Sequence, residues 1–234
     1  MRRIDLPEGL SGSNLIPSLA VMGKTPVYVE DGRYNKIILD GEDVSSVQVA
    51  SILSRDFERM HYLDILGIRD GSVEWNMFQS IMDVGNEVWA DTGAVVSDSV
   101  IDIIMSGATR AIISTKMVES LEEIVSSLEL SDNLVLQMDY NGKLVSKDGR
   151  IVKMDPADFA SEMAALGIED FIIDDITPER NRISTGILED ILDVLGSECS
   201  VYAGAEEISE AEDVIARGAR GAIISCSRIL EGIR

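Results

Sequence analysis

The sequence has 234 residues, 45% of them hydrophobic, which matches the size of one (βα)8 barrel (roughly 250 residues) and predicts a single domain. The net charge of −22 argues against nucleic acid as a partner, because the long-range field repels a phosphate backbone. No apolar run approaches the roughly 20 residues of a membrane span, and the first residues lack a signal-peptide core, so we expect a cytoplasmic protein without a membrane partner.

Residues 1–13 form a polar lead-in, and a repeating pattern occupies residues 14–234. In this part, short apolar runs typical of buried parallel strands alternate with segments whose apolar residues recur at helical spacing. The predicted strands are 14–20, 60–64, 87–90, 110–114, 133–138, 170–174, 200–203 and 221–225. The predicted helices are 45–57, 73–84, 97–105, 118–128, one starting near Pro156, 185–195, 209–216 and 227–233. Hairpins are expected at 27–39 and 144–154.

The chain also repeats itself at about half its length. Residues 107–114 (GATRAIIS) match 218–225 (GARGAIIS), an offset of 218 − 107 = 111, and 63–65 (LDI) match 174–176 (DDI) at the same offset. A third pair, 19–24 and 138–143, places Ala20 opposite Asp139. Strict alternation and a half-chain repeat predict an α/β fold, a single closed (βα)8 TIM barrel built from two half-barrels. An open doubly wound sheet is the alternative, but the sequence has no nucleotide-binding glycine motif to support it.

A closed barrel would carry its site at the C-terminal ends of the strands, where several carboxylates are expected to meet. Carboxylates that converge raise each other's proton affinity, so one of them becomes available as a general acid near neutral pH. Asp139 is the main catalytic candidate, and Asp64, Asp91 and Asp175 are candidates for the second role. Each could instead cap a helix.

The other reactive residue types limit the kinds of catalytic and metal site that we expect in this chain. The single histidine, His61, is three residues before Asp64, and we expect it on the opposite strand face, toward the helices. One histidine argues against a Ser-His-Asp apparatus and a histidine-rich metal site. A carboxylate site for Mg²⁺ or Ca²⁺ is the alternative use of the acidic mouth. We expect no metal and no cofactor.

Phosphate binding is predicted at two strand ends. Hydroxyls, helix-start N–H groups and one cation each occur after the fourth strand, at Ser114 and Thr115, and after the eighth, at Ser225 and Ser227. Helix capping alone is the alternative role of these side chains. The loop after the seventh strand is unsuited to an anion because it contains two glutamates, at 206–207.

These features together resemble a known family. The half-barrel repeat is accompanied by motifs at 16–19 (IPSL), 61–65 (HYLDI), 138–139 (MD), 221–224 (GAII) and 230–232 (LEG). The chain from about Asn14 onward resembles the HisA/HisF group of histidine-biosynthesis barrels, closest to the ProFAR isomerase side and its archaeal HisA/HisF-related branch.

The resemblance implies a mechanism with two aspartates, at the ends of the first and fifth strands, acting as acid and base in an aminoaldose-to-aminoketose rearrangement. The fifth-strand position is Asp139, whereas the first-strand position is Ala20. The phosphate loops of the family are changed as well, at 91–93 (DTG) and 206–207 (EE), and the expected Asp-Gly-Thr falls near 179–181 (ERN). Loss of one acid–base group costs roughly 10²–10⁴ in rate, which argues against standard ProFAR isomerase activity.

The sequence therefore predicts a divergent enzyme of this group, isomerase-like, with a small-molecule substrate that is sugar-like or a cofactor precursor, with or without a phosphate. The archaeal branch implies a setting in cofactor biosynthesis related to methanopterin. The alternative is a catalytically inactive barrel that works as a binding or assembly subunit. The oligomeric state is left open.

Overall fold

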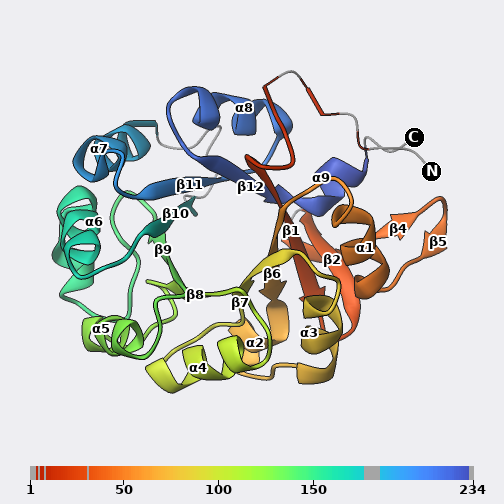
Figure 1. Cartoon of the computed structure of the whole chain (residues 1–234), viewed down its shortest axis with the longest axis horizontal. Coiled ribbons are helices and arrows are strands. Elements are labelled where there is room, and N and C mark those ends of the chain that lie inside the picture. The colour runs from red at the N-terminus through yellow and green to blue at the C-terminus, as the bar shows by residue number, and fades with distance from the viewer. Residues whose placement is uncertain (1–3, 5, 8, 31, 177–184, 232–234) are drawn as a thin grey trace.

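The structure is a computed structural model that describes residues 4, 6, 7, 9–30, 32–176 and 185–231. Its centre is a ring of eight parallel strands, which confirms the predicted closed barrel (Figure 1). The strands of the ring are β1 (Leu15–Met22), β6 (Arg59–Asp64), β7 (Glu87–Asp91), β8 (Arg110–Ser114), β9 (Leu134–Tyr140), β10 (Asp170–Asp175), β11 (Ser200–Ala205) and β12 (Gly221–Ser225). The ring closes because β12 pairs with β1 in parallel, with Ile16 opposite Ile223.

Helices form an outer layer around the strands (Figure 1). They are α1 (Ser46–Leu53), α2 (Ile65–Asp70), α3 (Trp75–Met82), α4 (Ser97–Met105), α5 (Leu121–Leu130), α6 (Pro156–Ala165), α7 (Thr185–Leu195), α8 (Ile208–Ala216) and α9 (Cys226–Leu230). The short α2 is an addition to the prediction, and Asp64 initiates it by accepting a hydrogen bond from the backbone N–H of Gly67. No helix in the described part of the chain combines the length and apolar character that a membrane crossing requires.

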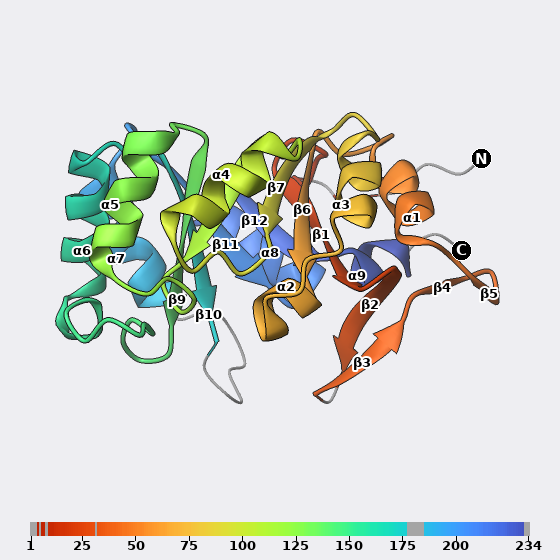
Figure 2. The same cartoon turned by 90° about the horizontal axis from the view of Figure 1, so that it is seen from below.

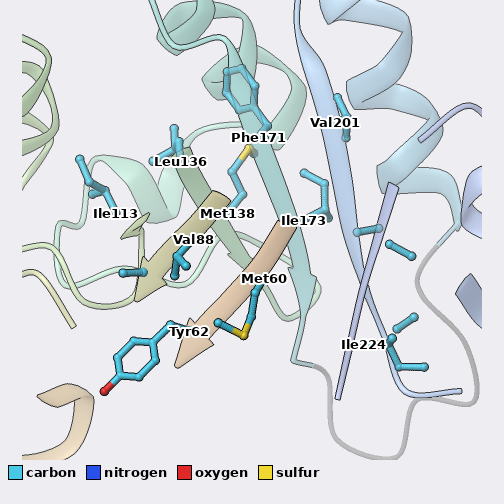
Figure 3. Packing of buried hydrophobic residues seen from close by; sticks show 14 of the residues in the cluster. Met60, Tyr62, Val88, Ile113, Leu136, Met138, Phe171, Ile173, Val201 and Ile224 are labelled. Atoms are coloured by element: carbon cyan, nitrogen blue, oxygen red, sulfur yellow. The ribbon is translucent and has the colours of Figure 1, made fainter. Parts of the chain in front are cut away.

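Each barrel strand has two buried faces. The outward face packs against the helices and forms the larger core, part of which Figure 3 shows through Met60, Tyr62, Leu136 and Met138. The inward face fills the barrel with a second cluster, which consists of Ile16, Trp89, Ile112, Val135, Ile172, Tyr202 and Ile223. The barrel interior is therefore a packed core rather than a pore.

A layer of charged side chains closes the N-terminal end of the barrel. Arg110 forms ion pairs with Asp170 at 2.7 Å and with Glu87 at 3.9 Å, and Arg59 binds Glu87 at 3.0 Å. The indole N–H of Trp89 donates to Glu87 at 2.8 Å. These pairs neutralise the charges that the first residues of β6, β7, β8 and β10 place at the edge of the apolar interior.

The predicted first hairpin is present, and the second is not. β2 (Thr25–Glu30) and β3 (Arg33–Lys36) extend beyond the barrel at the end where β10 stops (Figure 2), and β4 (Ile38–Leu39) pairs with β5 (Glu42–Asp43). The expectation of a hairpin at 144–154 is wrong: this segment has one bridge, from Tyr140 to Leu144, and a 3-10 helix, η1 (Ile151–Lys153).

Side-chain hydrogen bonds explain this difference. The Asp148 carboxylate accepts from the backbone N–H groups of Leu121 and Arg150, at 3.0 and 2.8 Å. The Arg150 guanidinium binds Asp148 and Glu122, so the polar groups of the segment are satisfied against α5 instead of a second strand.

Candidate functional site

Three carboxylates face the barrel interior at the C-terminal ends of their strands. Asp91, Asp139 and Asp174 lie two or four residues after Trp89, Val135 and Ile172, and therefore on the same inward strand faces. Asp139 and Asp174 are direct register partners on neighbouring strands. A Cβ placed on Gly204 of β11 would lie 3.1 Å from Asp174 Oδ1, which shows that this carboxylate also borders the next strand.

Asp139 is fully buried and is held by donors on both oxygens. Its Oδ2 accepts from the Ser114 hydroxyl at 2.5 Å, the Thr115 hydroxyl at 3.3 Å and the Lys116 backbone N–H at 3.1 Å. Its Oδ1 accepts from the Gln137 amide at 3.0 Å and lies 3.4 Å from Lys116 Nζ. The β8–α5 connection thus fixes the orientation of this carboxylate.

Gln137 and Lys116 connect Asp139 to its neighbours. The Gln137 side-chain amide reaches Asp174 Oδ2 at 3.4 Å as well as Asp139, so it bridges two carboxylates. Burial opposes the charge of Lys116, yet its pKa is raised because Asp139 and Asp174 stabilise the ammonium group. Sequence reasoning considered Lys116 only as a cation for phosphate.

Asp91 is a buried carboxyl group with a raised pKa. Burial raises its pKa to about 7, with further increases from Asp139 and Asp174, against an opposing hydrogen bond from the Gly93 N–H at 2.9 Å. Gly93 has φ 76°, and a Cβ there would lie 2.6 Å from Ile68 Cα, so only glycine fits this turn. Asp91 is therefore partly protonated near neutral pH.

The other two predicted catalytic residues lie on outward strand faces. Asp64 is the register partner of Val21, a member of the outer core, and its carboxylate caps α2 through Gly67 at 2.8 Å. Asp175 lies on the same strand face as Ile173, also in the outer core. The structure therefore does not bring either carboxylate to the inward cluster.

Sequence reasoning missed Asp174 because it chose the adjacent residue, Asp175. Alternation along β10 places Asp174 and Asp175 on opposite faces of the strand. It does not reveal which face is inward, because buried parallel strands are apolar on both faces.

His61 faces the barrel interior, so the expectation that it points toward the helices is wrong. Its register partners are Ser18 and Trp89, and its Nδ1 lies 2.9 Å from the Ser18 hydroxyl. Burial lowers its pKa to about 4, so the ring is neutral at physiological pH. Its Nε2 is buried without a hydrogen-bond partner.

The predicted phosphate residues are engaged within the chain. Ser114 and Thr115 bind Asp139, as described above. The Ser225 and Ser227 hydroxyls lie 2.9 Å from each other. Residues 179–181, where the Asp-Gly-Thr was expected, lie outside the described residues.

No group of three or more His, Cys, Asp or Glu side chains among the described residues is arranged to hold a metal ion.

A model of the family described as "Histidine biosynthesis protein" matches residues 14–230 of the chain. The chain belongs to the histidine biosynthesis protein family. No curated protein gives a significant match. Within this family barrel, Asp139 is the last but one residue of the fifth strand of the ring, and Ala20 lies on the first strand, level with Leu63 of β6. Asp174 of β10 lies beside Asp139 in this histidine-biosynthesis barrel, as its direct register partner.

Proposed function

We propose that this chain is an isomerase-type enzyme that moves protons on a sugar-like metabolite, with Asp139 and Asp174 as the acid–base pair. The observation that carries this proposal is the register of the two residues, which places their carboxylates on adjacent strands at one end of the barrel. Neighbouring strands lie roughly 5 Å apart, within the reach of one substrate carbon–oxygen unit.

Conversion of an aldose-type to a ketose-type compound requires removal of a proton from one carbon and delivery of a proton to its neighbour. A base and an acid on the same side of the substrate supply both steps. Asp174 occupies the role left open by Ala20, and the Gln137 amide orients both carboxylates. Asp91, with its pKa near 7, is a proton reservoir beside them.

Proton exchange with solvent tests this proposal without knowledge of the natural substrate. Wild-type protein is incubated in D₂O with a panel of aldoses and N-substituted aminoaldoses, and deuterium incorporation beside the carbonyl is followed by NMR. We expect exchange with at least one compound and no turnover of ProFAR. Asp139→Asn and Asp174→Asn should each slow exchange by roughly 10²–10⁴-fold.

Asp175→Asn is the matched control, because Asp175 neighbours Asp174 but lies on the outward face. It should retain exchange once circular dichroism shows that it is folded. Equal losses in the two variants would contradict the assignment of Asp174 over Asp175.

A catalytically inactive barrel is the second candidate, and one observation favours it. Asp139 has 0% exposure and its oxygens are fully engaged by Ser114, Thr115, Lys116 and Gln137, as expected of a structural carboxylate. Under this alternative no compound undergoes exchange, and Asp139→Asn lowers the free energy of unfolding without any change in activity.

A further inference from the structure

Asp64 is a buried carboxylate that the proposed chemistry does not use. Its side chain is 2% exposed and lies on the outward face of β6, so it does not reach the barrel interior. Its Oδ1 accepts the Gly67 backbone N–H at 2.8 Å and so fixes the first turn of α2, which lies at the C-terminal end of the barrel (Figure 2). The contacts of this turn therefore decide what Asp64 can influence.

The first turn of α2 packs backbone against backbone on the connection that follows β7. A Cβ on Gly67 would lie 2.6 Å from the carbonyl oxygen of Thr92, and a Cβ on Gly93 would lie 2.6 Å from Ile68 Cα. Neither side has room for one more carbon, and backbone atoms cannot rotate away as a side chain can. A displacement of the first turn of α2 must therefore displace the turn at Gly93.

The turn at Gly93 also holds Asp91. The Gly93 N–H donates to Asp91 Oδ1 at 2.9 Å, and this bond lowers the pKa of Asp91 against the effect of burial. The charged groups that act on Asp91 come from other elements: Asp139 of β9, Asp174 of β10, and Lys116 of the β8–α5 connection. Among these influences, the Gly93 N–H is thus the one that α2 controls.

We propose that Asp64 is a positioning residue, which holds the Gly93 N–H against the Asp91 carboxyl group through the first turn of α2. Each step from Asp64 to Asp91 is a hydrogen bond or a close backbone contact. The inference rests on the proposed function only in its use of Asp91 as a proton reservoir, and the positioning itself is a property of the free protein.

Removal of the Asp64 carboxylate should raise the pKa of Asp91. Asp64→Ala deletes the acceptor of the Gly67 N–H, so the first turn of α2 loosens and the Gly93 N–H moves away from Asp91. Loss of one such donor should raise the pKa of Asp91 by roughly 0.5–1. Loss of a negative charge nearby would instead lower this pKa. The sign of the change therefore separates positioning from a charge effect.

Two glycines of α2 provide a test that leaves Asp64 in place. Gly67→Ala inserts a Cβ against the Thr92 carbonyl and should also raise the pKa of Asp91. Gly71→Ala is the matched control, because Gly71 ends α2 with φ 68° and a Cβ there meets no atom within 4 Å. It strains the same helix without pushing the turn, so the pKa of Asp91 should stay unchanged. Asp64→Asn keeps an oxygen that can accept from Gly67 and should not raise it.

The pKa of Asp91 is measured by ¹³C NMR titration of the side-chain carboxyl groups from pH 4.5 to 9, and its signal is identified by its absence in Asp91→Asn. Circular dichroism establishes that each variant is folded. If Asp64→Ala does not fold, the comparison of Gly67→Ala with Gly71→Ala decides. An unchanged or lowered pKa in folded Asp64→Ala or Gly67→Ala, or an equal rise in Gly71→Ala, would overturn the proposal.

The titration needs no substrate, so its outcome is independent of the deuterium-exchange experiment. A raised pKa of Asp91 in both variants, together with no exchange by the wild type, would refute the catalytic proposal alone. Exchange by the wild type, together with an unchanged pKa in the variants, would refute only the positioning role of Asp64.

Discussion

One buried carboxyl group at the C-terminal end of the barrel, that of Asp91, is partly protonated near neutral pH. Asp91 is 4% exposed, and burial and two neighbouring carboxylates raise its pKa to about 7. The same strand geometry separates Asp174 from Asp175, because successive side chains point to opposite faces. At the residue scale, the proposed function therefore depends on which of two adjacent aspartates, Asp174 or Asp175, faces inward.

Asp91 should make the stability of the protein depend on pH. Between its unfolded value of 3.8 and about 7, the folded protein holds a proton that the unfolded chain has released, so stability falls as pH rises through this window. Asp91→Asn mimics the protonated form and removes this fall. A pKa difference of this size corresponds to a fall of roughly 4 kcal/mol at most in the free energy of unfolding.

Urea unfolding of both proteins from pH 4.5 to 8 measures the effect. The stability of Asp91→Asn relative to wild type should increase with pH. A difference that stays constant over the range would show that Asp91 ionises normally.

At the scale of the strands and their connections, the two ends of the barrel have separate tasks. The N-terminal end holds the ion pairs of Arg110 and Arg59, whereas the C-terminal end holds the inward carboxylates.

Strand alternation with helices was predictable because apolar runs and helical spacing are local patterns. The missing second hairpin was not predictable, because Asp148 and Arg150 bind groups on α5 that lie nearby only in the fold.

Removal of Arg110 should destabilise the barrel without loss of the proposed chemistry. Arg110→Met leaves the Asp170 carboxylate, whose side chain is 10% exposed, without its partner at 2.7 Å. We expect a loss of roughly 1–3 kcal/mol in the free energy of unfolding.

Lys36→Met is the control for this change, because the Lys36–Asp43 pair is largely exposed. It should change stability by less than about 0.5 kcal/mol. Equal effects of the two substitutions would show that the N-terminal charge layer does not stabilise the barrel. Loss of deuterium exchange in folded Arg110→Met would show that the two ends are coupled.

At the scale of the whole molecule, a net charge of −22 on 234 residues opposes compaction. Salt shortens the screening length from about 10 Å at 0.1 M to about 3 Å at 1 M, which weakens this self-repulsion.

We therefore expect the melting temperature to rise with salt. A gain of about 2 kcal/mol between 0.05 and 1 M KCl would raise it by roughly 5 °C. Calorimetry in KCl and NaCl provides the measurement, and screening predicts equal increases in both. A flat response would show that the acidic surface does not limit stability, and a difference between the two salts would indicate specific ion binding.

The sequence by itself determined the number and order of the barrel strands, the closure of the ring and the end at which Asp91 and Asp139 lie. These properties follow from local periodicity and from the half-chain repeat. Only the tertiary structure decided that Asp174 rather than Asp175 faces inward, that His61 lies inside, and that Ser114 and Thr115 bind Asp139. The physical reason is that a buried parallel strand is apolar on both faces, so its inward side is defined by neighbours that are distant in sequence.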